Sequence, residues 1–421
     1  MDILRPNILR NAHLALSLYR PSTRTTAAAL CISASQPWQP DASAPSAKVP
    51  VVLPRHLDDA VNSYLRGIKT KDLRALVDHF ESLVYASLPR TANIRHLDPN
   101  RLTIPYDTPT YVKAYLAKRF VGSYSAITHV LQQLATRLPD YHPKHVLDVG
   151  AGPGTALWAS SQFWTADAYT AVEPSRHMAH ALQEISNAAY GTRIITIEPR
   201  LNTKIQADLV ICAFVLTDIA TQSSRAELID SLWSSSTDIL VLIESATPSG
   251  FKLIEDARAQ ILKKCTHGSI HVVAPCPHEF ACPMSRTKSW CHFPRRYLPT
   301  AKMRALNPKS PDTLTSIKFS YCILRKSPPP PLTQRYPILN ASPMKQKGHV
   351  TLDYCAPSGQ LERAVISKKK GNYKAARKIQ WGDVWSEEIV TKRVVKVVKE
   401  ELHGRDANDD ADKGKNVIAS I

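Results

Sequence analysis

Three closely spaced glycines follow a short apolar segment in the middle of the chain. Residues 146–149 are predicted to form a buried strand, Gly150, Gly152 and Gly154 follow it, and residues 156–163 have the pattern of a helix. Glycine allows a tight backbone turn and lets a ligand approach the N–H groups at the start of a helix. A strand, a glycine loop and a helix in this order therefore predict a site for a nucleotide-type ligand.

The spacing of these glycines separates two kinds of cofactor loop. The dinucleotide fingerprint needs its third glycine one place later, where Thr155 stands. The shorter G-x-G-x-G spacing resembles motif I of S-adenosylmethionine-dependent methyltransferases, in which the loop passes the methionine part of the cofactor and an acid ending the second strand binds the ribose hydroxyls. Glu173 directly follows the second predicted strand, residues 168–172. The cofactor-binding residues implied by this resemblance are Asp148, Gly150, Gly152, Gly154 and Glu173.

The sequence assigns no catalytic residue. Enzymes of this class that methylate exocyclic base nitrogens resemble one another in an Asn/Asp-Pro-Pro-aromatic segment after the fourth strand, and residues 213–218 lack it. Cys212 could be compared with the nucleophile of 5-methylcytosine enzymes, but it directly follows the apolar strand residues 209–211, so a buried and inert thiol is expected. Methyl transfer is therefore left undecided, and the protein is described as methyltransferase-like.

A second candidate site is formed by cysteines. Cys276, Cys282 and Cys291 lie within sixteen residues, and prolines follow the first two. Converging soft thiolates hold zinc or an iron–sulfur cluster, whereas a metal-free group of thiols is the structural alternative. Zinc on three thiolates and one imidazole and a cluster on four thiolates fit equally well. Candidates for the fourth ligand are Cys355, Cys322, His278 and His292.

Basic residues gather towards the C-terminal end of the chain. Residues 361–399 contain eleven Lys or Arg and four Asp or Glu, with Tyr373, Trp381 and Trp385 among them. Cations contact phosphates and aromatic rings stack on unpaired bases, which favours irregular or single-stranded RNA as the partner. The alternative is a solvated basic helix over 386–402 whose valines pack inward. The predicted RNA-binding residues are Lys368, Lys369, Lys370, Lys374, Arg377 and Lys378.

The composition of the whole chain agrees with a polyanionic partner. Lys and Arg number 54 against 36 Asp and Glu, which gives a formal net charge of +18. An anionic membrane surface would match this charge, but no long basic amphipathic helix supports it. The longest apolar run, residues 207–220, is shorter than the about 20 residues needed to cross a bilayer, so no membrane span is expected. Eight unevenly spaced cysteines in so long a chain exclude a secreted disulfide framework.

The first thirty residues have the composition of a mitochondrial transit peptide. Four arginines, at positions 5, 10, 20 and 24, stand against the single acid Asp2, with serines and threonines between them. A basic terminus without a targeting role is the alternative. We therefore expect the protein in the mitochondrial matrix.

The elements around these sites predict an α/β fold. Apolar residues recur at helical spacing over 57–138, and four short apolar strands then alternate with helices. This pattern indicates a Rossmann-like, mostly parallel sheet of the S-adenosylmethionine methyltransferase type, with an N-terminal helical region, a Cys-rich metal-binding insertion and a small β extension at the C-terminal end. Residues 349–354 and 361–366 predict a β-hairpin within that extension.

The expected layout has six parts. They are a presequence and linker over 1–50, a helical region over 51–140, a methyltransferase-like core over 141–273, a Cys-rich metal-binding region over 274–326 that returns to the sheet, a basic β/helical extension over 327–400 and a flexible tail over 401–421.

These features together resemble one family. A methyltransferase-type core interrupted by the cysteine segments and followed by G-H-V-T-L-D-Y-C, the basic segment and Trp381-Gly382-Asp383 is similar to the methyltransferase-like assembly proteins of the mitochondrial small ribosomal subunit, over roughly residues 60–385. The resemblance implies a [4Fe-4S] cluster on Cys276, Cys282, Cys291 and Cys355. It also implies action on the nascent small subunit around its rRNA, which mitochondrial translation requires.

The leading functional hypothesis is an RNA-binding assembly factor of the mitochondrial small ribosomal subunit, with little or no enzymatic activity. Its partners would be the small-subunit rRNA and small-subunit ribosomal proteins. One alternative is an active S-adenosylmethionine-dependent rRNA methyltransferase. Another is a structural component that stays in the mature subunit.

Overall fold

The computed structural model describes residues 49–87, 106, 108–191, 195–264, 268–307, 314–369, 372–387, 389 and 392–394. These residues belong to one structural unit of the chain, residues 38–421. The predicted presequence up to residue 48, Lys370 and the predicted tail over 401–421 lie outside the described residues.

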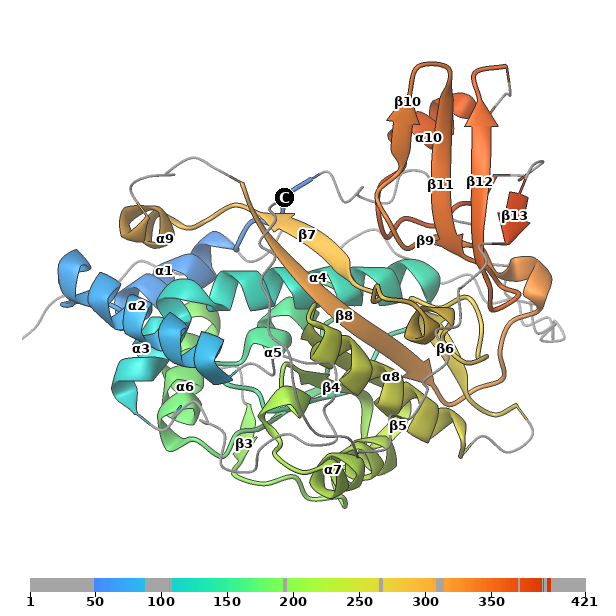
Figure 1. The fold of residues 1–421 in the computed structure, drawn as a ribbon. Helices are drawn as coiled ribbons and strands as arrows, with labels where there is room; N and C mark the ends of the chain where they lie inside the picture. The colour runs from blue at the N-terminus through green and yellow to red at the C-terminus, as the bar shows by residue number, and fades with distance from the viewer. Residues whose placement is uncertain are drawn as a thin grey trace, which may run out of the picture. The chain divides into compact units, whose positions relative to one another are not determined.

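The larger sheet within the described residues has eight strands. Its order is β3-β2-β1-β4-β5-β8-β6, with β7 paired to β8, and Figure 1 shows its strands between layers of helices. Strands β1 to β5 run parallel, whereas β8 runs antiparallel to β5, β6 and β7. Their bounds are β1 His145–Val149, β2 Ala168–Val172, β3 Thr196–Glu198, β4 Ala207–Ala213, β5 Ser236–Ser245, β6 His271–Ala274, β7 Phe293–Tyr297 and β8 Thr315–Arg325.

Alternate residues of the central strands enter two separate hydrophobic cores. On β5, Ile239, Val241 and Ile243 pack into the core that contains α4, whereas Leu240 and Leu242 pack into the core that contains α7 and α8. Both faces of a parallel sheet are covered by helices, so its strands are apolar throughout rather than alternating. This is why the short apolar segments of the sequence predicted the sheet correctly.

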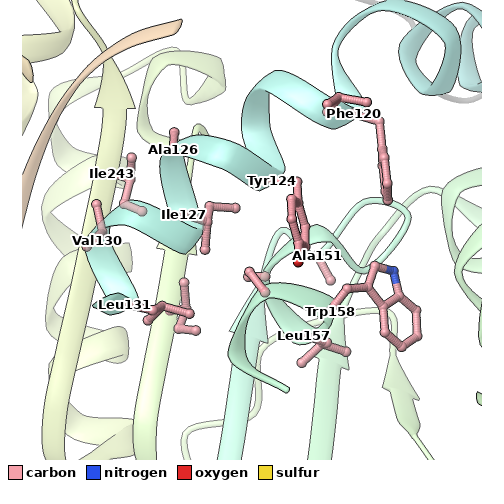
Figure 2. Packing of buried hydrophobic residues seen from close by; sticks show 14 of the residues in the cluster. Phe120, Tyr124, Ala126, Ile127, Val130, Leu131, Ala151, Leu157, Trp158 and Ile243 are labelled. Carbon is pink, nitrogen blue, oxygen red and sulfur yellow. The ribbon is translucent and has the colours of Figure 1, made fainter. Parts of the chain in front are cut away.

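The helices cover both faces of this sheet. Helix α4 packs against α5 and β8, and α1 packs against α6. Figure 2 shows Phe120 and Tyr124 of α4 on the side of Trp158 of α5, and Val130 near Ile243 of β5. The helix bounds are α1 Arg55–Tyr64, α2 Thr70–Ser87, α3 Pro109–Lys118, α4 Phe120–Arg137, α5 Thr155–Ser160, α6 Arg176–Tyr190, α7 Gln222–Ser235, α8 Pro248–Leu262, α9 Ala301–Leu306 and α10 Tyr373–Lys378.

A second, smaller sheet follows the first along the chain (Figure 1). It has the order β10-β11-β12-β13, with β9 paired to β11, and helix α10 packs against β11 and β12. The predicted hairpin is confirmed, because β11 and β12 pair antiparallel with Tyr354 opposite Glu362. The strand bounds are β9 Ile338–Leu339, β10 Met344–Gln346, β11 His349–Cys355, β12 Leu361–Ser367 and β13 Lys392–Val394.

The alternative of a basic helix over 386–402 is wrong for the part that is described. Residues 392–394 form β13, an edge strand that pairs with β12 through the register Ala364–Lys392 to Glu362–Val394. Val394 ends this strand, and β-branched residues such as valine favour extended backbone. No helix among the described residues is both long and apolar enough to span a membrane.

Candidate cofactor loop and cysteine cluster

The loop after β1 has a backbone conformation that glycine adopts most readily. Gly150, Gly152 and Gly154 have φ angles of 76°, 53° and 82°. A Cβ on Gly154 would lie 2.9 Å from the Trp158 ring, whereas a Cβ on Gly152 would meet no described atom within 4 Å. The glycines are therefore needed for the turn itself, and the loop is open beside Gly152.

Glu173 lies against this loop, as the order of the elements predicted. Its Oε2 accepts a hydrogen bond of 2.7 Å from the N–H of Gly152, and its Oε1 accepts one of 2.8 Å from the N–H of Ser175. Ser175 also caps α6 by accepting from the N–H of Met178, so the start of α6 fixes the carboxylate. Each oxygen keeps a second lone pair, which can accept a hydroxyl donor.

Asp148 is a buried acid of β1 beside the start of α5. The N–H groups of Ala156 and Leu157 donate to its carboxylate, while Oδ2 has no hydrogen-bond partner among the described residues. Burial and, second, the charge of Glu173 raise the pKa of Asp148 to about 8. The side chain is therefore mostly protonated at neutral pH and can donate or accept a hydrogen bond at this site.

The loop after β4 packs directly on the glycine loop. A Cβ on Gly150 would lie 2.3 Å from Cγ2 of Val215. The neighbouring Phe214 has a φ of 63°, an unusual value for a bulky residue. The side chain of Val215 therefore fills the space beside Gly150, whereas the space beside Gly152 stays open.

Glu244, at the end of β5, holds the same loop and was missed by the sequence analysis. Its two oxygens accept hydrogen bonds of 3.1 and 2.7 Å from the N–H and hydroxyl of Thr217. Burial raises the pKa of Glu244 to about 7, and the hydrogen bonds from Thr217 oppose this shift. An acid at the end of an apolar strand was a visible signal, but only the fold shows which loop it meets.

The N-terminal helical region also reaches the loop. Tyr115 of α3 lies close enough to Asp148 for their charges to interact, and burial raises the pKa of its phenol. The backbone oxygen of Tyr106 accepts a hydrogen bond of 3.1 Å from the Ser175 hydroxyl. The helical spacing of this region predicted its helices but carries no sign of what each helix face meets.

The predicted metal-binding cysteines come from two parts of the chain. Cys276, Cys282 and Cys291 belong to the insertion between β6 and β7, and Cys355 ends β11 of the smaller sheet. Nε2 of His278 lies 3.2 Å from Sγ of Cys355. The fold therefore brings the insertion into contact with the smaller sheet.

Two of these cysteines, Cys282 and Cys291, pack against the same apolar cluster. Burial raises the pKa of Cys282 to about 12, and the charge of Cys276 adds to this shift. Burial also raises the pKa of Cys291. The charges of Cys282, Cys276 and Cys355 add to this shift, in that order. Cys322, the other cysteine considered as fourth ligand, is 1% exposed in the core of β8. Cys212 is likewise buried, as predicted.

Arg258 of α8 contacts the insertion that carries three of these cysteines. Its Nη2 donates a hydrogen bond of 2.7 Å to the backbone oxygen of His278. Burial lowers the pKa of this guanidinium, but the charges of Cys276, Cys322 and Cys282 outweigh burial and raise it. The sequence analysis missed Arg258, because a single arginine in an amphipathic helix has no distinguishing pattern.

The donor chemistry of this cluster fits a soft metal centre. Four thiols suit zinc or iron–sulfur chemistry. Among the described residues, however, no group of three or more His, Cys, Asp or Glu side chains is arranged to hold a metal ion. The ligand types therefore agree with the prediction, and their arrangement is not that of a closed ion site.

The basic segment is exposed where it is described. Lys368 and Lys369 follow β12, and Lys374, Arg377 and Lys378 are exposed on α10. Its aromatic residues do not behave as expected for base stacking. Trp385 is 2% exposed in the core of the smaller sheet, and the half-buried Trp381 packs edge-on against His292 with ring centroids 4.7 Å apart. Apolar area on a small sheet is better buried in its core than exposed to solvent.

A family model described as "Mitochondrial small ribosomal subunit Rsm22" matches residues 109–386. The match covers the glycine loop, the cysteines and α10. The chain belongs to the Rsm22 family.

Two curated relatives of the Rsm22 family support this placement. "Ribosome assembly protein METTL17, mitochondrial" of Homo sapiens is 28% identical over 291 residues, which cover 64% of this chain and 61% of the relative. "Rsm22-cox11 tandem protein 2, mitochondrial" of Schizosaccharomyces pombe is 28% identical over 348 residues, covering 71% of this chain and 46% of the relative. The chain thus spans less than two thirds of the length of either relative.

Among solved structures, the magnesium protoporphyrin IX methyltransferase of Synechocystis PCC 6803 with bound S-adenosylhomocysteine is similar to 49% of this chain and 84% of that enzyme, with 16% identity and a TM-score of 0.31. The strand order of the larger sheet, rather than this superposition, defines the Rossmann-like fold. The predicted methyltransferase-type α/β fold is confirmed for this Rsm22-family chain. The roles of its loop glycines, acids, cysteines and lysines stay predictions.

Proposed function

We propose that this chain is an RNA-binding assembly factor of the mitochondrial small ribosomal subunit, located in the matrix and required for mitochondrial translation. The observation that carries the proposal is the Rsm22 family match across residues 109–386, since it includes both sheets rather than the common α/β core alone. The human relative is named a mitochondrial ribosome assembly protein, which agrees with it.

Sucrose-gradient sedimentation of mitochondrial lysate tests this proposal. The tagged full chain should co-sediment with immature small subunits and be missing from mature ones. Equal recovery with mature subunits would instead support a resident ribosomal protein. Absence from both kinds of particle would contradict the proposal.

The exposed lysines and arginines near the C-terminal end are proposed to contact rRNA phosphates. Support comes from their exposure after β12 and on α10, and from the net charge of +18. The proposed contacts are Lys368, Lys369, Lys370, Lys374, Arg377 and Lys378. Because its tryptophans are packed into the protein, this surface would bind RNA through charge more than through base stacking.

Cys276, Cys282, Cys291 and Cys355 are proposed to hold a [4Fe-4S] cluster, with zinc as the alternative. The contact of His278 with Cys355 and the apolar cluster shared by Cys282, Cys291 and Leu361 support this proposal. When bound, the metal centre would supply ligation energy that joins the β6–β7 insertion to the smaller sheet. Metal analysis of anaerobically purified protein separates iron from zinc, and the absence of both would reject the site.

The glycine loop is proposed to bind S-adenosylmethionine through Asp148, Gly150, Gly152, Gly154 and Glu173. The free space at Gly152 and the lone pairs of Glu173 support binding. Packing of Val215 on Gly150 shows that part of the loop is already occupied by the protein. An active rRNA methyltransferase is the alternative function, and labelled methyl transfer to small-subunit RNA by the wild-type chain would favour it over a scaffold.

A further inference from the structure

We propose that Arg258 is a positioning residue for the cysteine site, because its buried guanidinium balances the negative charge of metal-bound thiolates. This inference rests on the metal site proposed above and adds a residue to it. Arginine stays protonated in proteins, so its charge must be balanced whether or not metal is present.

The hydrogen bonds of Arg258 leave its charge uncompensated. The residue is 5% exposed, Nη2 donates to the uncharged carbonyl of His278, and Nε has no hydrogen-bond partner among the described residues. Burying a charge without an opposite charge is strongly unfavourable. An anionic group beside Arg258 would remove this cost.

The acids closest to Arg258 along α8 and the insertion are engaged elsewhere. Glu255 and Asp256 pair with Lys252 at 3.2 and 2.8 Å. Glu279 pairs with Arg335 at 2.6 Å. The charge of Glu279 also acts on Arg258, but after those of Cys276, Cys322 and Cys282. Cys276 lies two residues before His278, whose backbone oxygen accepts from Arg258, so the insertion places a group that can become an anion beside this cation.

Metal binding would turn Cys276 and Cys282, two of the proposed ligands, into anions near Arg258. Cysteines bind metal as thiolates, so the bound site is negatively charged whether it holds zinc or a cluster. Arg258 would then stabilise the loaded site. The same charge would destabilise the metal-free protein, since neutral thiols cannot balance it.

Arg258 also reaches the fourth proposed ligand through His278. The backbone oxygen of His278 accepts from Arg258, and Nε2 of the same residue lies 3.2 Å from Sγ of Cys355. These two contacts of His278 therefore connect α8, which packs on the larger sheet, with β11 of the smaller sheet. Residues that hydrogen-bond to metal ligands commonly orient those ligands in this way.

The test compares Arg258→Met, Arg258→Lys and the wild-type full chain, each in metal-loaded and metal-free forms. Arg258→Met should lose metal to a chelator about 10–100-fold more readily. It should lower the Tm of the loaded protein and raise the Tm of the metal-free protein. Arg258→Lys keeps the charge and should stay close to wild type in both forms. A merely structural arginine would not reverse the sign of its effect between the two forms.

Arg225→Met is the matched control, because Arg225 of α7 is also buried and donates to the backbone oxygens of Ile219 and Ala220. It should leave metal retention unchanged. If the metal is iron, Arg258→Met should also shift the reduction potential to lower values, since a nearby cation favours the more negative reduced state.

The outcomes separate this inference from the site on which it rests. Wild-type protein without iron or zinc would overturn both. Wild-type protein with metal, together with an Arg258→Met variant that retains it equally well, would overturn the role of Arg258 alone. Equal metal loss in the Lys and Met variants would also overturn it, because charge would then not be the property that matters.

Discussion

At the glycine loop, three buried acids control the local electrostatics. Asp148, Glu173 and Glu244 lie at the carboxyl ends of β1, β2 and β5 of the larger sheet, and burial raises the pKa of each. Backbone N–H groups and Thr217 hold their oxygens in place. These three acids therefore lie near the carboxyl ends of the strands, where α/β proteins bind ligands.

This arrangement predicts how stability depends on pH. The pKa of Asp148 is about 8 in the folded protein against an ordinary 3.8, so between these values the folded state binds a proton that the unfolded state lacks. Stability should therefore fall as pH rises from 6 to 8, by up to about 1.4 kcal/mol per pH unit from this residue. Asp148→Asn should reduce this slope in urea unfolding measured at several pH values, and the smaller slope that stays comes from Glu173 and Glu244, whose pKa values are also raised.

The control for that experiment is Asp208→Asn. N–H groups of His145 and Lys144 outweigh the effect of partial burial and hold the pKa of Asp208 below its ordinary value. Asp208 is ionised in both states above pH 6, so its variant should keep the wild-type slope. An unchanged slope in Asp148→Asn would contradict the predicted protonation.

Two glycines of the loop should respond differently to alanine. Gly154→Ala combines a left-handed backbone with a Cβ 2.9 Å from Trp158, and it should lower the free energy of unfolding by about 2–3 kcal/mol. Gly152→Ala has the backbone strain without the steric contact and should cost about 1 kcal/mol. Chemical denaturation checks both, and equal losses would show that the Trp158 contact is unimportant.

Among the elements, the insertion between β6 and β7 contacts both sheets. Trp290 Nε1 donates to the Ala246 oxygen at 2.9 Å, and Ser320 Oγ donates to the Cys291 oxygen at 2.7 Å. Cys282 and Cys291 share an apolar cluster with Leu361 of β12. The insertion can therefore respond to events in either sheet.

Removal of one proposed ligand should loosen this connection. Cys276→Ser should lose the bound metal and speed protease cleavage within residues 275–292, because ligation energy contributes to folding of the joined segments. Metal content and limited proteolysis measure the two effects. Cys212→Ala, a buried thiol on β4, should retain both metal and protection. Full metal retention by Cys276→Ser would exclude it as a ligand.

Helix α10 and its surroundings should govern RNA affinity through charge. Reversing Lys374, Arg377 and Lys378 to Glu should weaken binding to small-subunit rRNA fragments and reduce the slope of log affinity against log salt by about 2–3. The matched control reverses Arg66, Lys69 and Lys71, which are exposed beside α1 and α2. Similar losses in both variants would mean that net charge, rather than this surface, attracts the RNA.

For the whole molecule, the family match spans both sheets, so the proposed function belongs to their combination. The S-adenosylmethionine-type fold alone specifies no activity, because sites rather than folds determine chemistry. The cysteine cluster lies where the β6–β7 insertion contacts β11 and β12 of the smaller sheet. A scaffold role would need this connection more than it needs methyl transfer.

A complementation experiment can distinguish the two functions. In cells lacking the protein, Glu173→Ala should restore mitochondrial translation to near the wild-type level if the chain is a scaffold, whereas Cys276→Ser should not. Incorporation of labelled amino acids into mitochondrial products measures the outcome. Failure of Glu173→Ala at normal protein abundance would favour the methyltransferase.

Much of the fold was predictable from particular residues. The strand, the three glycines and Glu173 were recognisable because a left-handed turn requires glycine and because parallel strands are apolar throughout. The hairpin of β11 and β12 was recognisable from alternation around a Pro-Ser-Gly turn. The burial of Trp385 was not, since an aromatic residue among lysines has the same pattern whether it faces RNA or a core.

The sequence by itself determined the α/β core, the glycine loop with its acid and the unusual grouping of cysteines, because each depends on local backbone or spacing rules. Only the tertiary structure decided that Glu244 holds Thr217, that Val215 packs on Gly150 and that Arg258 donates to His278 of the cysteine insertion. These contacts join residues from different elements. They follow from how the helices and sheets pack, which local periodicity does not specify.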